Sequence, residues 1–379
     1  MVANVPLAGM DNLLTPRVLA DPVELTRVLV DIESVSGAEE EIADAVEGAL
    51  RDVPHLRVER HHHTVMARTG TGRDRRVILA GHLDTVPVAG NLPARVDGDL
   101  IHGCGTSDMK SGVALALHLA VTCPRPRYDV TYLFYEAEEV EAERNGLTLV
   151  ARERPEWLAA DFAVLLEPTY GVVEAGCQGT LRVAVRTSGT RAHSARSWYG
   201  VNAIHAAAEV LDRLRRYRPR QVAIDGCEYR EGLNAVGIRG GVAGNVIPDE
   251  CQVEVNYRFA PDRSVEAAIG HVTEVFAGYD VRVADAAPGA PPGLTASPAV
   301  EFLAAVGAPA QAKLGWTDVS RFAARGVPAL NFGPGDPNLA HSRGERVEIR
   351  RIRAGVEVLR RWLDAGGAGN GCIAATVGR

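Results

Sequence analysis

Five short segments of this chain place a histidine or a carboxylate at the end of an apolar run or beside a glycine. Together they supply two histidines and several carboxylates, and divalent metal ions readily bind imidazole nitrogens and carboxylate oxygens. Two such ions held side by side can activate a water molecule and polarise a carbonyl group. The pattern therefore predicts a two-metal centre for hydrolysis. The segments are residues 81–84, 107–110, 138–139, 167–168 and 340–341.

The five segments contain enough ligands for two ions. We expect His82 to bind one ion and His341 to bind the other. Asp108 can bridge both ions, because a carboxylate has two oxygens. Glu139 and Glu167 would then complete one ion each.

Two further acids stand next to these ligands. Glu138 is the expected general base, because adjacent residues can direct one carboxylate to the metal and the other to the attacking water. It would return the proton to the leaving nitrogen. Asp84 lies two residues after His82, so on an extended segment both side chains face the same side. We expect Asp84 to hold the second imidazole nitrogen.

Each segment taken alone has a simpler explanation. His82 could be a structural histidine, and Asp108 could cap a helix that begins near Ser111. The acids around Glu138 could form a solvated loop, and residues 167–168 could form a turn. Their shared position near strand ends favours the metal centre over these separate readings.

A run of three histidines, His61-His62-His63, is a different case. Neighbouring side chains of an extended segment point to opposite sides. We therefore expect that this run does not converge on one metal ion.

The elements that must position the ligands alternate along the chain. Short apolar runs at residues 75–81, 130–135 and 162–166 predict buried strands. Residues 111–120 and 146–154 between them predict helices. This alternation indicates an α/β fold with a mostly parallel sheet and helices on both faces. Sites in such sheets lie outside the carboxyl ends of the strands. His82, the Glu138-Glu139 pair and Glu167 each lie within about three residues of an expected strand end.

Helical patterns also begin and end the chain. Residues 22–52 predict an amphipathic helix in two parts, broken near residues 34–37. Residues 352–364 predict a final helix. The glycine-rich tail from Ala365 is expected to be disordered.

The pattern changes near Cys177. Residues 180–187 and 252–259 alternate between apolar and polar side chains, which is typical of strands with one solvated face. Helices are expected at residues 201–217 and 264–277. We interpret this region as a smaller α+β domain inserted into the first, with residues 286–293 as the return linker.

Composition narrows the class of protein. The 379 residues are 46% hydrophobic, enough for a large core and two domains. The net charge is −7 and the basic residues form no dense stripe, so nucleic acid is not an expected partner. No apolar run reaches the length of a membrane span and no signal-peptide pattern begins the chain. We expect a cytoplasmic protein that does not bind a membrane.

Six cysteines are scattered without a C-x-x-C pair. In a cytosolic chain we expect them to be reduced and mostly buried as small apolar residues. Their spacing predicts neither a metal site nor a disulfide framework.

The segments together resemble the M20 family of zinc peptidases and deacylases, over about residues 22–364. Several motifs in the same order carry this resemblance. They are Gly81-His82-Leu83-Asp84-Thr85-Val86-Pro87, Gly103-Cys104-Gly105-Thr106-Ser107-Asp108-Met109-Lys110, Glu138-Glu139, Glu167-Pro168, Ala192-His193-Ser194-Ala195, Asn245-Val246-Ile247-Pro248 and His341.

The resemblance implies two zinc ions, with cobalt or manganese as possible substitutes. It implies a catalytic domain of residues 1–176 and 291–379. It also implies an inserted ferredoxin-like lid of residues 177–290, through which two copies form a homodimer. A strained or cis peptide is expected after Asp108.

Within the family, three segments resemble the desuccinylase branch: residues 145–147, 315–322 and 331–336. This implies a small N-acyl amino acid substrate, N-succinyl-LL-2,6-diaminopimelate, hydrolysed to succinate and LL-2,6-diaminopimelate. Sister activities remain open, namely deacetylation of N-acetylornithine or N-acetyl-lysine, or dipeptide hydrolysis. A non-catalytic homologue is a third possibility, and the intact ligand set and Glu138 argue against it.

The resemblance also implies roles outside the metal ligands. His193 would reach the partner subunit's site and stabilise the oxyanion. Arg258 would bind a substrate carboxylate. Asn245 and Thr317 would hydrogen-bond the substrate. Gly333 and Gly335 would let the backbone approach the ligand closely.

Two positions depart from the family pattern. Ala137 stands just before the Glu pair, where the family often has an acid, and Glu136 lies one residue earlier. Leu83 stands where threonine is frequent. Neither position is an expected ligand.

Overall fold

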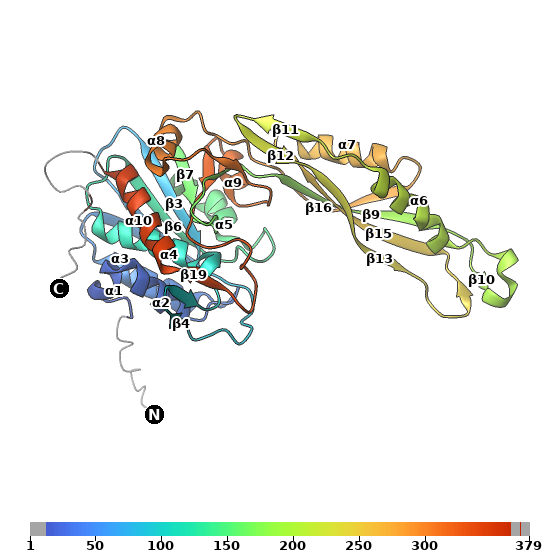
Figure 1. Cartoon of the computed structure of the whole chain (residues 1–379), viewed down its shortest axis with the longest axis horizontal. Helices are drawn as coiled ribbons and strands as arrows, with labels where there is room; N and C mark the ends of the chain where they lie inside the picture. Colours follow the sequence, from blue (N-terminus) through green and yellow to red (C-terminus); the bar gives the residue numbers. More distant parts are fainter. Residues whose placement is uncertain (1–12, 365–371, 373–379) are drawn as a thin grey trace, which may run out of the picture. The chain divides into compact units, whose positions relative to one another are not determined.

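A computed structural model describes residues 13–364 and Cys372 (Figure 1). The chain divides into two compact units. The first contains Met1–Glu174, Gly293–Ala310 and Arg325–Arg379, and the second contains Ala175–Pro292 and Gln311–Ala324.

The boundary between the two units differs from the expected domain boundary in one segment. Residues 311–324 were expected in the first domain, but they belong to the second unit. Their contacts explain this: the Trp316 indole donates to the Pro288 carbonyl and the Cys177 thiol to the Thr317 carbonyl. The chain therefore returns to the second unit after it has first left it.

The first unit contains a mostly parallel sheet (Figure 1). Four strands run parallel, and two antiparallel strands extend one edge. The sheet continues beyond these strands with two short ones, β8 (Glu174–Ala175) and β17 (Gln311–Ala312). In spatial order its first six strands are β1 (Leu56–His61), β2 (Thr64–Thr69), β6 (Asp129–Tyr135), β3 (Arg76–His82), β7 (Phe162–Leu165) and β18 (Ala329–Asn331).

The parallel strands are apolar because both of their faces are covered. Every residue of β6 and β7 is buried, as is every residue of β3 after Arg76. Helix α4 (Ser111–Thr122) packs on β3 and β6 and is itself buried from Ser111 to Ala120. The expected strands and the α4 helix are confirmed.

The other predicted helices of the first unit are present, and the structure adds two that were not expected. The two-part helix appears as α2 (Pro22–Asp31) and α3 (Glu40–Arg51), and Asp21 caps α2 by accepting from the Val23 N–H. The final helix begins three residues earlier than expected. The others are α1 (Pro16–Ala20), α5 (Gly146–Glu153), α8 (Ser297–Val306) and α10 (Ile349–Leu363), and a small sheet joins β4 (Arg95–Asp97), β5 (Leu100–His102) and β19 (Arg346–Glu348). The tail expected to be disordered lies outside the described residues, apart from Cys372.

The second unit has the β-α-β-β-α-β order of a ferredoxin-like fold. Its antiparallel sheet has the order β13-β15-β9-β16, and two helices pack against it. Alternate residues of β9 and β15 are buried, as the sequence predicted. The elements are β9 (Gly179–Ser188), α6 (Ala203–Arg216), β13 (Gly232–Gly240), β15 (Glu250–Phe259), α7 (Val265–Val275) and β16 (Asp280–Ala287).

Short elements extend this framework. Strands β10 (Ala192–His193) and β14 (Val246–Ile247) pair with each other, and β11 (Gln221–Ile224) pairs with β12 (Cys227–Arg230). Helix α9 (Val319–Ala323) follows in the returning segment. Among the described residues, no helix combines the length and the apolar character that a membrane crossing requires.

One expectation about the cysteines is wrong. Cys123, at the end of α4, forms a disulfide with Cys372. The sequence separation of 249 residues gives no pattern that predicts such a pair. The other four cysteines are free and buried, as expected.

Candidate metal centre

Three of the predicted ligands, His82, Glu139 and Glu167, lie at or just after the ends of neighbouring parallel strands. His82 ends β3 and pairs in register with Tyr135, the last residue of β6, so the loop that carries Glu138 begins beside it. On the other side of β3, Ala80 pairs with Leu165, the end of β7. Three strand ends thus meet at one edge of the sheet, as expected for this fold class.

His82, Asp108 and Glu139 form the core of the site. One donor atom from each lies within 4.8 Å of the other two. The His82 Nε2 is 3.2 Å from Asp108 Oδ1, and the imidazole is 1% exposed. Imidazole and carboxylate donors at this spacing suit a divalent ion.

His341 lies on the other side of the same carboxylates. Its Nε2 is 2.8 Å from Glu139 Oε1 and 3.4 Å from Asp108 Oδ2. Asp108 therefore presents one oxygen to His82 and the other to His341. This is the arrangement that a bridging carboxylate between two ions requires.

Glu167 is the fifth expected ligand. It is buried and follows β7, and the preceding Leu166 N–H donates to the Ala80 carbonyl near the end of β3. It does not belong to the compact group formed by His82, Asp108 and Glu139 among the described residues. Its role as a ligand stays a prediction.

The histidines and carboxylates of the site shift one another's pKa. Burial opposes protonation of His82, but its bonds to Asp108 and Asp84 raise its pKa well above the usual value. Hydrogen bonds to Asp108 and Glu139 raise the pKa of His341 to about 10. The same two histidines hold the pKa of Asp108 well below its usual range, although burial opposes this. Without metal, the acids therefore favour the protonated, positively charged form of both imidazoles.

Asp84 contacts both the His82 ring and the loop that carries the Glu pair. The His82 Nδ1 is 3.0 Å from the Asp84 backbone carbonyl and 3.5 Å from its carboxylate, so Asp84 orients the ring mainly through its backbone. Its carboxylate accepts hydrogen bonds from the Glu138 N–H at 3.0 Å and the Glu139 N–H at 3.1 Å. The Ser36 hydroxyl donates to it at 2.7 Å.

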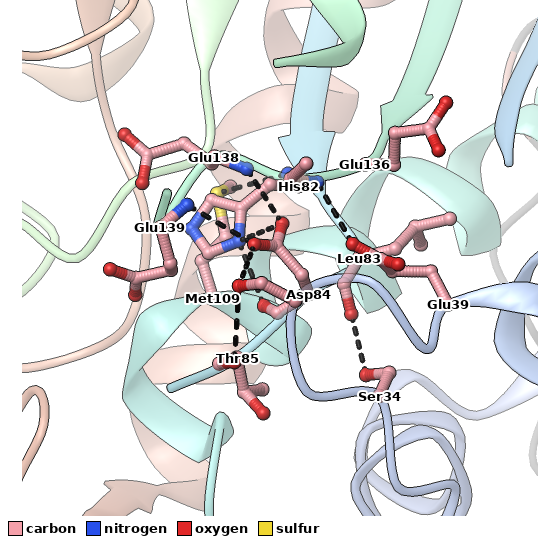
Figure 2. Close-up of polar contacts among 12 residues, drawn as sticks. Ser34, Glu39, His82, Leu83, Asp84, Thr85, Met109, Glu136, Glu138 and Glu139 are labelled. Atoms are coloured by element: carbon pink, nitrogen blue, oxygen red, sulfur yellow. Dashed lines mark hydrogen bonds and ion pairs between the residues drawn. The ribbon is translucent and has the colours of Figure 1, made fainter. Parts of the chain in front are cut away.

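Sequence reasoning missed two buried acids that shape the ligand loops. Glu39, 1% exposed, accepts from the Ala137 N–H at 3.0 Å, immediately before the Glu pair (Figure 2). Glu345, 2% exposed, accepts from the N–H groups of Gly105, Ser107 and Asp108. Each has a weak sequence signal: Glu39 follows the helix break, and Glu345 lies four residues after His341.

The same loops contain the Asp108–Met109 peptide and Glu136. The Asp108–Met109 peptide is cis, as predicted. Glu136 does not replace the missing acid at position 137, because it accepts hydrogen bonds from the His63 N–H and the Thr64 hydroxyl. Figure 2 shows its carboxylate pointing away from Glu138 and Glu139.

Two residues of the histidine run lie close to each other. His61 and His62 have ring centroids 4.5 Å apart, and both group with Glu153 of α5 within 4.8 Å. The two rings approach each other because His62 is not extended: its φ of 52° places it in the turn between β1 and β2.

The other expected site residues belong mostly to the second unit. His193 ends β10, and the following Ser194 N–H donates to the Asn245 carbonyl, so His193 and Asn245 lie on adjacent short segments. Arg258 lies on β15 and is partly buried, and Thr317 is buried. Their substrate contacts stay predictions.

Gly333 and Gly335 have a structural explanation within the first unit. A Cβ at Gly333 would lie 2.4 Å from the Leu166 carbonyl oxygen, and one at Gly335 would lie 2.3 Å from that of Ser107. The close approach that requires glycine here is therefore to the protein's own backbone, on loops that carry Glu167 and Asp108.

The fold and this ligand set define a class of metal-dependent hydrolases. Residues 78–365 match the family model described as Peptidase family M20/M25/M40, and the chain belongs to this family.

Two similar relatives carry more specific names. A Mycobacterium tuberculosis protein named putative succinyl-diaminopimelate desuccinylase is 59% identical, over 90% of this chain and 98% of its own length. A Corynebacterium glutamicum succinyl-diaminopimelate desuccinylase is 49% identical, over 91% and 96%.

Solved structures agree on the fold. A Staphylococcus aureus tripeptidase superposes with a TM-score of 0.74 at 21% identity, over 91% of this chain and 97% of its own. A Bacillus subtilis protein described as a dinuclear metal binding peptidase from the M20 family gives 0.66 at 16% identity, over 90% and 96%.

Proposed function

We propose that this protein is a metal-dependent amide hydrolase that converts N-succinyl-LL-2,6-diaminopimelate into succinate and LL-2,6-diaminopimelate, a step of lysine and diaminopimelate biosynthesis. The observation that carries the chemistry is the placement of His82 and His341 on the two oxygens of Asp108. The names of the two relatives, aligned over almost their whole length, support the substrate.

The donor set fits two divalent ions, and we propose zinc, with cobalt or manganese as substitutes. The residues that would hold them are His82, Asp108, Glu139, Glu167 and His341. When bound, two such ions lower the pKa of a water molecule and polarise an amide carbonyl.

Glu138 is proposed to move the proton. Its carboxylate would accept a proton from the water that attacks the amide carbon and then donate it to the departing amine nitrogen. The reaction thereby restores the carboxylate. The bond between the Glu138 N–H and Asp84 fixes the backbone from which this carboxylate extends.

His193 is proposed to stabilise the oxyanion in the partner subunit's site. Its Nδ1 accepts a hydrogen bond from the Ala195 N–H at 3.0 Å. A neutral imidazole with an accepting Nδ1 carries its proton on Nε2. The exposed ring therefore has a donor available for a developing negative charge.

Substrate carboxylates are proposed to bind Arg258. In the described part of the chain no ion pair joins Arg258 to an acid, and its side chain is partly buried. A guanidinium in such a position can bind a carboxylate through two parallel hydrogen bonds. Asn245, Thr317, Gly333 and Gly335 are proposed to complete the substrate contacts.

The experiment that tests this function compares two substrates. The zinc-loaded protein should hydrolyse N-succinyl-LL-2,6-diaminopimelate with a much higher kcat/KM than N-acetylornithine. A preference for N-acetylornithine would keep the metal centre and refute the substrate. Hydrolysis of neither compound, with two metal ions bound, would refute the proposed function.

A further inference from the structure

Three consecutive N–H groups of the loop that carries the Glu pair are bound by buried acids. Asp84 accepts from Glu138 and Glu139, one bond to each oxygen. Glu39 accepts from Ala137. The loop backbone is therefore fixed from beneath by two carboxylates (Figure 2).

Ala137 needs such a partner more than its neighbours do. Its φ of 55° lies in the left-handed region. For a residue with a Cβ this conformation costs about 1–2 kcal/mol. An outside contact must therefore hold it, and the bond to the Glu39 carboxylate is positioned to do so.

Glu39 is itself firmly anchored. It directly precedes α3, where a negative charge interacts favourably with the helix dipole. Its second oxygen accepts from the Gly37 N–H at 2.8 Å. The segment before it is tied to the end of β3, because the Ser34 hydroxyl donates to the Leu83 carbonyl and the Thr85 N–H to the Ser34 carbonyl.

We propose that Glu39 is a positioning residue for the hydrolytic site: by holding the Ala137 N–H, it sets the direction in which Glu138 and Glu139 leave the backbone. This inference rests on the proposed hydrolase function. Glu39 acts through the loop, since its carboxylate is bonded to backbone N–H groups.

The test compares Glu39→Gln with Glu40→Gln. The amide at position 39 keeps the size of the side chain but offers one carbonyl oxygen to two N–H donors. Glu40 is the neighbouring exposed acid and loses the same charge. We expect kcat of Glu39→Gln to fall about 10–100-fold, the range seen when groups that orient metal ligands are changed. KM and the metal content should stay close to the wild-type values, and Glu40→Gln should match the wild type.

A spectroscopic readout separates positioning from general stability. With cobalt in the site, the visible absorption of Glu39→Gln should change, because Glu139 approaches the metal differently. If Glu39→Gln folds poorly, Glu39→Asp keeps both acceptor oxygens and should show a smaller loss of kcat. Unchanged kcat and spectrum in the folded variants would overturn the inference. An inactive wild-type protein would instead refute the proposed function.

A second inference comes from the histidine run. The His61 Nε2 lies 3.0 Å from Glu153 Oε2, and the His62 ring lies beside the His61 ring. Arg152 binds the other oxygen, Oε1, at 2.6 Å, so Oε2 stays turned toward the histidines. We infer that His61, His62 and Glu153 form a separate surface site for a borderline divalent ion such as zinc.

The donor chemistry and the geometry support this site. Two imidazoles and one carboxylate are ligands that zinc commonly uses, with water in the open position. Metal–ligand bonds of about 2.0–2.1 Å require donors at most about 4.2 Å apart. The observed donors lie within 4.8 Å, and the exposed His62 and Glu153 side chains can rotate to close this difference.

Equilibrium dialysis against zinc tests the surface site without using activity. The wild type should bind one more zinc ion per chain than His62→Ala or Glu153→Gln. His63→Ala is the matched control, because its Nδ1 faces Arg60 and it lies outside the group. It should bind as much zinc as the wild type. Equal zinc content in all four proteins would overturn this inference.

Discussion

Asp108 is the residue on which the metal centre depends, because both histidines converge on its carboxylate. The geometry arises from its backbone as much as from its side chain. Glu345 holds the Asp108 N–H at 3.0 Å and two further N–H groups of the same segment. The loop is therefore shaped before any ion binds, which lowers the reorganisation that binding requires.

Glu138 gives the clearest prediction at this scale. Glu138→Gln should lower kcat by about 10²–10⁴-fold, the usual contribution of a general base. Its metal content should equal that of the wild type, because Glu138 is proposed as the general base and not as a metal ligand. Elemental analysis and steady-state kinetics measure both quantities. Normal turnover would contradict the assigned role.

Metal uptake should release protons. In the metal-free protein the pKa of His341 is raised from 6.5 to about 10, so at pH 8 the folded state holds a proton that the unfolded state lacks. This contribution to folding stability is complete below pH 6.5 and is lost as the pH rises through about 10. A metal ion needs the neutral imidazole.

Calorimetric titration of zinc at pH 8 in two buffers of different ionisation enthalpy measures this release. The observed heat should differ between the buffers for the wild type. The difference should be smaller for His341→Ala. Equal heats in both buffers would show that His341 is already neutral.

The ligands of the centre could be predicted from sequence. The buried acids that hold the backbone of the ligand loops could not. His82, Asp108, Glu139 and His341 belong to short sequence motifs, and the structure brings these four together. Glu39 and Glu345 act through backbone N–H groups of distant segments, and no local pattern reports such bonds. The closeness of His61 and His62 was not foreseen, because the left-handed φ of His62 takes it out of the extended conformation.

Among the elements, α4 begins directly after the Asp108 segment and approaches the end of β7. A Cβ at Gly112 would lie 2.1 Å from the Leu166 carbonyl oxygen, next to Glu167. Only glycine allows the helix and the end of β7 to approach this closely. The packing of α4 thereby fixes the distance between the Asp108 segment and the Glu167 segment.

Gly112→Ala should separate these two segments. Overpacking of this kind destabilises a fold by about 1–3 kcal/mol, and activity should fall with it. Gly48→Ala is the matched control: it lies in α3 with open space at its Cβ. That change should stabilise the protein by about 0.5–1 kcal/mol. Thermal unfolding of both variants measures these changes in stability. An equal change in Gly112→Ala and Gly48→Ala would contradict the packing argument.

Element types were largely predictable because their patterns are local. The apolar runs of β3, β6 and β7 and the interrupted helix α2–α3 appear at the expected positions. Boundaries moved by a few residues, as at the start of α10. The disulfide between Cys123 and Cys372 could not be predicted, because it joins residues 249 positions apart in the sequence and depends on the tertiary fold.

At the scale of the whole molecule, the second unit has an edge strand with exposed apolar side chains. Strand β13 is at the edge of its sheet, with Val236 59% and Ile238 52% exposed. The neighbouring α6 exposes Ile204 and Leu211. An edge strand with exposed apolar side chains is a template for pairing with another chain. These features support the homodimer predicted from the resemblance.

Ile238→Lys should therefore convert a dimer into a monomer in size-exclusion chromatography with light scattering. Val283→Lys is the control on the opposite edge strand, where Val283 is 47% exposed, and it should remain a dimer. A wild-type monomer would refute dimerisation, and a dimeric Ile238→Lys variant would place the interface elsewhere.

The division into two units was nearly predictable from the change in strand pattern at Cys177. Residues 311–324 were misassigned, because their contacts with Cys177 and Pro288 are long-range and leave no periodic signal. This segment contains Thr317, so that proposed substrate contact belongs to the second unit.

The most direct test of the account is a crystal structure of the zinc-loaded protein with anomalous scattering at the zinc edge. We predict two peaks at the sheet edge, one beside His82 and one beside His341, with Asp108 between them. A single ion at this edge, or two ions that do not share Asp108, would contradict the central claim.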